Sequence, residues 1–145
     1  MKIDTTRFGS IPVNKEKIIH MPYGMLGFPD KKQYIVLEHQ ENSPFFWYQS
    51  LDDPGLAFVI TSPFLFIPNY RIDLNAMLKE MSWDTNGQND VLQLYIVVNI
   101  PKGMPQGMTG NFIGPILINN HLNQAVQMVL SNSPYTHKFP LLKKN

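Results

Sequence analysis

The residues able to do chemistry are few and lie far apart along the chain. The four histidines are at least sixteen positions from one another, and no two form a His-X-His or His-Glu-X-X-His pattern: His20, His39, His121 and His137. Metal sites usually include at least one close pair of ligands, so we interpret these as ordinary surface or packed histidines. The chain has no cysteine, which excludes disulfides, thiolate zinc sites and a cysteine nucleophile.

Asp52 and Asp53 are the obvious candidates for an acid/base pair. Neighbouring side chains on a strand point to opposite faces, and these two precede Pro54-Gly55, so a turn is the favoured interpretation. No serine lies in a Gly-X-Ser-X-Gly frame, and no Gly-X-X-X-X-Gly-Lys phosphate loop occurs. The sequence therefore predicts no catalytic, metal or cofactor-binding residues, and no enzyme activity.

The elements that would position any site are short. The 145 residues include 12 prolines and 9 glycines, a spacing that suits short strands joined by turns. Leu74, Met77, Leu78 and Met81 follow the one good helical pattern, a stripe that is mainly core but whose methionines leave room for an adaptable groove. We expect the main strands at 1–6, 11–13, 33–38, 45–51, 56–61, 91–100, 110–119 and 125–130.

This pattern predicts a mainly β fold, a compact antiparallel β-barrel-like single domain over 1–145 with one short helix. A parallel α/β sheet would need helices that are missing. Residues 131–145, with two prolines and terminal lysines, are expected to be a partly frayed C-terminal extension. In the aromatic run Phe45 to Tyr48, one face is assigned to the core and the other to a partner or a second covered surface.

Charge and hydropathy narrow the location and the partners. The first residues lack the apolar stretch of a signal peptide, and the apolar run 91–100 is too short to cross a bilayer, so we expect a cytoplasmic protein without membrane contact. Net charge is +1 and the lysines are scattered, which gives no support for direct nucleic-acid binding. We expect a monomer when the protein is free.

Several stretches together resemble the flagellar assembly factor FliW family. The resemblance runs from residue 2 to about 141 in unbroken order. Its motifs are Arg7-Phe8-Gly9, Pro22-Tyr23-Gly24-Met25-Leu26-Gly27-Phe28, the string from Pro44 to Pro54 that ends Gln-Ser-Leu-Asp-Asp-Pro, Met108-Thr109-Gly110-Asn111, and Pro115-Ile116-Leu117-Ile118-Asn119. The chain departs from the usual Gly-Leu-Pro-Gly-Phe-Glu at Gly24 to Pro29, and from Met-Thr-Ala-Asn at Gly110.

The resemblance implies a β-barrel-like fold and a role as a non-catalytic protein-binding regulator. Members of the family bind flagellin in the cytoplasm and also bind CsrA, a small RNA-binding repressor of flagellin translation, whose repression they relieve. The resemblance therefore implies two partners competing for one protein.

Most motif residues shape turns or fill the core, so the contact surface has to be chosen on other grounds. We predict contacts at side chains that combine expected exposure with hydrogen-bonding or adaptable chemistry: Asp52, Asp53, Met104, Met108, Thr109, Asn111, Tyr135 and His137. Two alternatives stay open, a small β-barrel that binds an apolar ligand and one that binds single-stranded nucleic acid.

Overall fold

The computed structural model describes residues 1–38, 40–84, 91–131 and 133–142. One α-helix, α1 (Asn75–Glu80), and short 3-10 turns connect the strands. The strands are β1 (Lys2–Thr5), β2 (Gly9–Pro12), β3 (Ile19–His20), β4 (Gln33–Glu38), β5 (Phe45–Ser50), β6 (Ala57–Thr61), β7 (Leu92–Asn99), β8 (Thr109–Gly110), β9 (Ile116–Asn119), β10 (Gln124–Gln127) and β11 (Phe139–Pro140).

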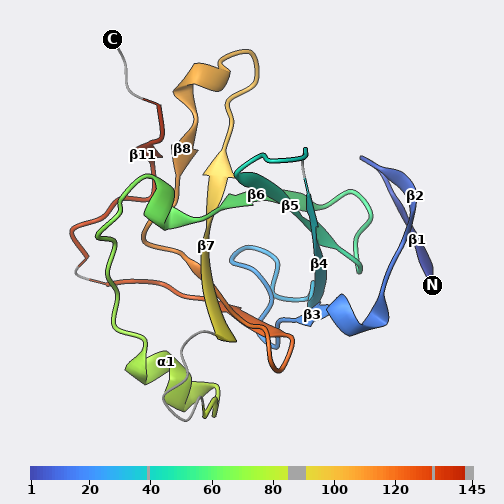
Figure 1. Ribbon diagram of the computed structural model, residues 1–145, viewed down its shortest axis with the longest axis horizontal. Coiled ribbons are helices and arrows are strands. Elements are labelled where there is room, and N and C mark those ends of the chain that lie inside the picture. The colour runs from blue at the N-terminus through green and yellow to red at the C-terminus, as the bar shows by residue number, and fades with distance from the viewer. Residues whose placement is uncertain (39, 85–90, 132, 143–145) are drawn as a thin grey trace.

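Strands β3 to β7, β9 and β10 close into a barrel (Figure 1). The hydrogen-bonded order is β7-β6-β5-β4-β3-β10-β9, and β9 pairs back onto β7 from Leu92↔Asn119 to Tyr95↔Ile116. The only parallel contact in this order is between β3 and β10, at His20↔Gln124. Closure leaves no long open edge, which is how small antiparallel sheets avoid aggregation.

A cluster of buried side chains packs inside the barrel. Strand alternation sends Tyr34, Tyr48 and Ile60 inward, where each is 0% exposed. The Tyr34 and Tyr48 rings stack with centroids 4.5 Å apart. The other buried members of this interior cluster are Ile19, Met21, Met25, Ile116, Ile118 and Ala125. A pocket of about 310 Å³ borders this cluster at Ile19, Val36, Tyr95 and Ile118, so the alternative of an apolar ligand stays open.

The outward faces of the same strands carry a second layer of packing. Trp83, Leu117, Val126 and Met128 form a cluster that α1 covers, and no residue of α1 itself is buried. A further cluster lies around β7, β8 and β11, with Tyr70, Ile96, Val98, Phe112 and Leu141 at its centre. The barrel thus positions an outer layer made largely of half-exposed side chains.

The β1–β2 hairpin lies against the outside of the barrel, at the right of Figure 1. The Thr6 amide donates to the Pro54 carbonyl over 3.0 Å, and Phe8 meets Trp47 edge to face at 5.7 Å between centroids. Phe46 and Tyr48 face the interior, so the aromatic run divides between the core and a surface that the hairpin covers in part.

The mainly β barrel with one short helix is confirmed, and the helix and the strand at 33–38 lie where the sequence predicts them. The single strand expected at 110–119 is wrong, because a turn at 112–114 separates β8 from β9. The side-chain oxygen of Asn111 accepts the Ile113 amide hydrogen at 3.2 Å and helps to form that turn. Across the part of the chain that the structure describes, every helix is too short to span a bilayer.

Candidate protein interface

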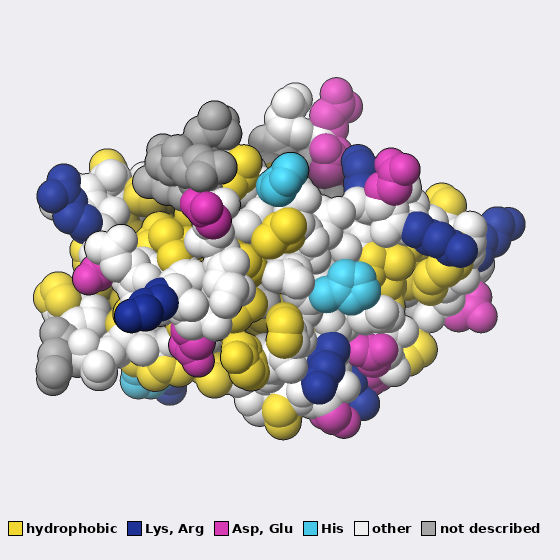
Figure 2. Space-filling model, turned by 90° about the horizontal axis from the view of Figure 1, so that it is seen from below, with side chains coloured by type: hydrophobic (Ala, Val, Ile, Leu, Met, Phe, Trp, Pro, Cys, Tyr) yellow, Lys and Arg dark blue, Asp and Glu magenta, His cyan; other side chains and the backbone are white. Residues whose placement is uncertain are grey.

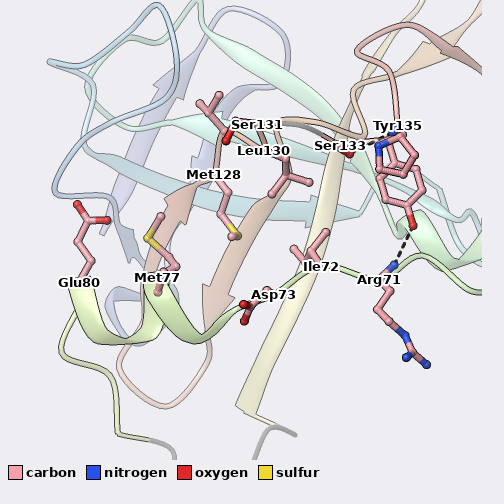
Figure 3. A pocket seen from close by; sticks show the side chains of 13 residues that line it. Arg71, Ile72, Asp73, Met77, Glu80, Met128, Leu130, Ser131, Ser133 and Tyr135 are labelled. Atoms are coloured by element: carbon pink, nitrogen blue, oxygen red, sulfur yellow. Dashed lines mark hydrogen bonds between the residues drawn. The ribbon is translucent and has the colours of Figure 1, made fainter.

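A groove of about 450 Å³ separates α1 from residues 128–131 and 133–135, the described part of the segment 128–135. Figure 3 shows Met77 from the helix and Met128 and Leu130 from the facing segment directed into the same space. The segment is held in place because the Met128 amide donates to the Pro115 carbonyl and the Leu130 amide to the Ile113 carbonyl, each over 2.8 Å. The floor of the groove is therefore apolar. Its methionine side chains can adopt several conformations, while hydrogen bonds hold the backbone at Met128 and Leu130 in place.

The rim of the groove is polar and carries charges of both signs. Asp73 and Glu80 stand at the two ends of α1, and Arg71 lies near Tyr135 at one end of the groove. Val129, at the edge, is 66% exposed although it is large and apolar. An apolar floor inside a polar rim is the usual anatomy of a protein-binding surface.

Tyrosines anchor one end of the groove. The Tyr135 hydroxyl accepts the Arg71 backbone amide hydrogen at 3.1 Å, and the Tyr135 ring packs on Tyr70 with centroids 4.7 Å apart. The Tyr70 hydroxyl donates to the Phe112 carbonyl over 2.7 Å. Burial, and to a smaller extent the neighbouring Tyr135, raises the pKa of Tyr70, so it stays a neutral donor.

The predicted contact residues of the C-terminal half come together. Thr109 pairs with Pro140, the Leu141 amide donates to the Met108 carbonyl, and the Phe112 amide donates to the Thr136 carbonyl. The loop 104–111 and the segment 135–140 are thus neighbours, at the top and left of Figure 1. Met104 and His137 are exposed, whereas Met108, Thr109, Asn111 and Tyr135 are half-buried.

Asp52 and Asp53 lie elsewhere, in the β5–β6 turn. One Asp52 carboxylate oxygen accepts the backbone amides of Lys32 at 2.7 Å and Gln33 at 3.0 Å. Asp53 accepts the Gly55 amide at 3.0 Å. Both carboxylates shape backbone in this structure, and Asp52 also has an exposed side chain.

The groove itself is not among the residues predicted as contacts. The signal for it is the methionine content of the 74–81 stripe, which indicates adaptable packing but does not say what faces the helix. Residues 128–131, expected to be strand and extension, supply the opposite wall. Only the fold reveals that these two stretches are neighbours.

No group of three or more His, Asp or Glu side chains is placed to hold a metal among the residues that the structure describes. Inside the barrel, burial raises the pKa of Tyr34 to about 12 and also raises the pKa of Tyr48 well above its usual value. Figure 2 shows acidic and basic side chains interspersed over one face, without the block of positive charge that nucleic-acid binding favours.

Comparisons with known proteins agree with this geometry. The family model described as FliW protein matches residues 2–141. The chain is 36% identical over 145 residues to the flagellar assembly factor FliW of Moorella thermoacetica, covering 100% of this chain and 90% of that protein. It is 40% identical over 143 residues to the corresponding protein of Syntrophus aciditrophicus, covering 99% and 89%. A crystal structure of the flagellar assembly factor FliW superimposes with a TM-score of 0.87 at 31% identity, covering 99% and 98% of the two chains.

Proposed function

The chain belongs to the FliW family of flagellar assembly factors, and on that premise we propose that it binds flagellin and a CsrA-type translational regulator in the cytoplasm. It acts by holding these proteins and catalyses no reaction. The observation that carries the proposal is the groove between α1 and 128–135, with its floor of Met77, Met128 and Leu130. Methionine side chains repack easily, which suits a surface that must accept more than one partner.

The proposed interface extends beyond the groove. Tyr135 belongs to the groove wall, and the hydrogen bonds of the following segment lead to the loop 104–111. We include the exposed or half-buried side chains along this path, and Asp52 and Asp53 as a separate contact near the β1–β2 hairpin. The residues of the extended path are Met104, Met108, Thr109, Asn111, Tyr135 and His137.

The proposed regulation is linkage between two partners. If both need the same protein, flagellin that accumulates occupies it and leaves the regulator free to repress translation. When flagellin is scarce, the protein binds the regulator and relieves the repression. No chemical step is required, only a difference in occupancy.

Isothermal titration calorimetry with the purified cognate flagellin and regulator tests the proposal. Val129→Glu places a charge at the edge of the groove without opening the core, since Val129 is 66% exposed. We expect it to weaken one or both complexes at least about tenfold, because binding would bury the new charge beside the apolar floor without a partner. Leu122→Glu, an exposed apolar residue in the β9–β10 turn, is the matched control and should change affinity by less than about twofold.

Absence of heat and of a complex on a sizing column with both partners would contradict the proposal. Competition is tested separately by titrating the regulator into protein saturated with flagellin. Competition predicts a large rise in the apparent dissociation constant of the regulator. An unchanged constant would mean that the two partners use separate sites.

A further inference from the structure

A second groove, of about 430 Å³, lies on the outside of the barrel where β6 and β7 separate. β6 pairs with β7 only from Thr61↔Ile96 to Val59↔Val98. Beyond this point β6 continues to pair with β5 at Ala57, and β7 continues to pair with β8 at Asn99. In an antiparallel ladder every second residue pair is hydrogen-bonded, so the next hydrogen-bonded pair, or rung, after Val59 and Val98 would be Ala57 with Ile100. The β6–β7 ladder ends before it.

The register shows which backbone groups this separation leaves open. The Ser50 amide donates to the Leu56 carbonyl, so along β6 the alternate residues Ala57 and Val59 turn their amide and carbonyl toward β7. Val59 finds its partner in Val98, while the ladder of described residues ends before Ala57 and gives it no partner on β7. An open rung of this kind can accept an extended chain through backbone hydrogen bonds.

The side chains around the open rung define what such a chain would carry. Val59 is half-buried, Val98 is buried and Ile100 is 45% exposed, so these three side chains give the groove an apolar stretch beside the polar Arg7 and Asn99. At its edge the Arg7 guanidinium lies 4.2 Å from the centroid of the Trp47 ring. Within the described ranges Arg7 makes no ion pair, and it is exposed, so a carboxylate can reach its guanidinium.

We infer that this groove binds an extended, acidic segment of a partner protein, which adds a short strand at Ala57 and Ile100 and places a carboxylate on Arg7. The inference rests on the proposed protein-binding function but concerns a different surface from the α1 groove. Backbone hydrogen bonds would set the register of the added strand. A β-branched side chain of that strand would contact Val59, Val98 and Ile100, and Arg7 would select for negative charge. A basic segment would leave Arg7 without a carboxylate partner, and a helical segment would leave the open rung unpaired.

The test uses the full chain labelled with nitrogen-15 and a pentapeptide probe, Thr-Val-Asp-Val-Thr, blocked at both ends. In heteronuclear NMR titrations we expect the amide signals of Ala57, Val59 and Ile100 to shift together. A peptide with Asn in place of Asp should bind about threefold to tenfold more weakly, the range for one charge-assisted contact. Arg7→Gln should abolish the difference between the two peptides, whereas Arg71→Gln, an exposed arginine at the other groove, should preserve it.

The inference is overturned if the shifts fall elsewhere, if both peptides bind equally, or if Arg71→Gln has the same effect as Arg7→Gln. Shifts of the same amides that appear with protein concentration alone would assign the groove to a second copy of this chain, and would also overturn it. Flagellin and the regulator are then titrated against Arg7→Gln. Failure of both to bind even the unaltered protein contradicts the proposed function and leaves the peptide result standing.

Discussion

The inside of the barrel and the layer outside it are packed in different ways. The interior side chains of Tyr34, Tyr48 and Ile60 are fully buried and close on one another. Outside, α1 covers the barrel with Leu74, Met77, Leu78 and Met81, all half-exposed. Close packing of buried side chains in the interior favours one conformation. The half-exposed side chains of the outer layer have more conformational freedom, which a binding surface can use.

Met21→Ala should cause the largest loss in stability. Met21 is 0% exposed within the interior cluster, so truncation leaves a cavity that the surrounding strands cannot close. We expect the free energy of unfolding to fall by about 3 kcal/mol. Urea denaturation followed by tryptophan fluorescence measures it, and a loss below about 1 kcal/mol would mean that the interior is not tightly packed.

Tyr70→Phe should have the next largest effect, although Tyr70 belongs to the outer layer. Its hydroxyl donates to the buried Phe112 carbonyl over 2.7 Å, and removal leaves that carbonyl without this donor. We expect a loss of about 1 to 2 kcal/mol in the free energy of unfolding. An unchanged denaturation midpoint would show that this hydrogen bond adds nothing to the outer layer.

Met77→Ala makes the same chemical change as Met21→Ala, but in the outer layer. Met77 is half-exposed and lines the groove, so water can fill the space left behind. We expect a loss of about 1 kcal/mol, and faster amide hydrogen exchange in α1 than in β5. Equal losses for the two methionines would remove the contrast between the regions.

Tyr48→Phe should change stability by less than about 0.5 kcal/mol. The Tyr48 hydroxyl is buried and has no hydrogen-bond partner in the structure, so its removal deletes no bond and relieves a desolvated polar group. Thermal denaturation beside Tyr70→Phe separates a partnered hydroxyl from an unpartnered one. A loss as large as that of Tyr70→Phe would show that the Tyr48 hydroxyl is bonded in solution.

Tyr34→Phe should leave stability nearly unchanged at neutral pH and alter it only in alkali. Burial, then the charges of Asp52 and Asp30, raise the pKa of Tyr34 from 10.0 to about 12. Between these two values the folded state keeps a proton on Tyr34 that the unfolded chain releases. The contribution of neutral Tyr34 to the free energy of unfolding is therefore intact below pH 10 and is lost as the pH rises toward 12. Urea midpoints between pH 9 and 12 should fall more steeply for the unaltered protein than for Tyr34→Phe.

The sequence predicts best where a pattern is local. The strand at 33–38 follows from its β-branched and aromatic residues, and the helix from apolar spacing at 74–81. The run 110–119 misleads because apolar residues lie on both sides of Gly114-Pro115 and suggest one strand. The turn between them is supported by a hydrogen bond that the Asn111 side chain accepts from the Ile113 amide, which periodicity cannot show.

Both grooves depend on contacts between distant parts of the chain, which no local pattern contains. The wall at 128–135 is held by hydrogen bonds from its amides to the carbonyls of Ile113 and Pro115. The same holds outside the grooves, where the Asp52 carboxylate accepts the amides of Lys32 and Gln33. The separation of β6 from β7 is a matter of where a ladder ends, which is set by register and twist. The sequence can therefore suggest residue types for an interface, but not which of them meet.

The single parallel contact between β3 and β10 has a consequence for synthesis. It joins His20 to Gln124, and the positions differ by 104 residues, since 124 minus 20 is 104. At ordinary ribosomal speed the second partner emerges on the order of 5 to 20 s after the first. Until that point β3 and β10 cannot pair, so closure of the barrel at this position is a non-local and slow event.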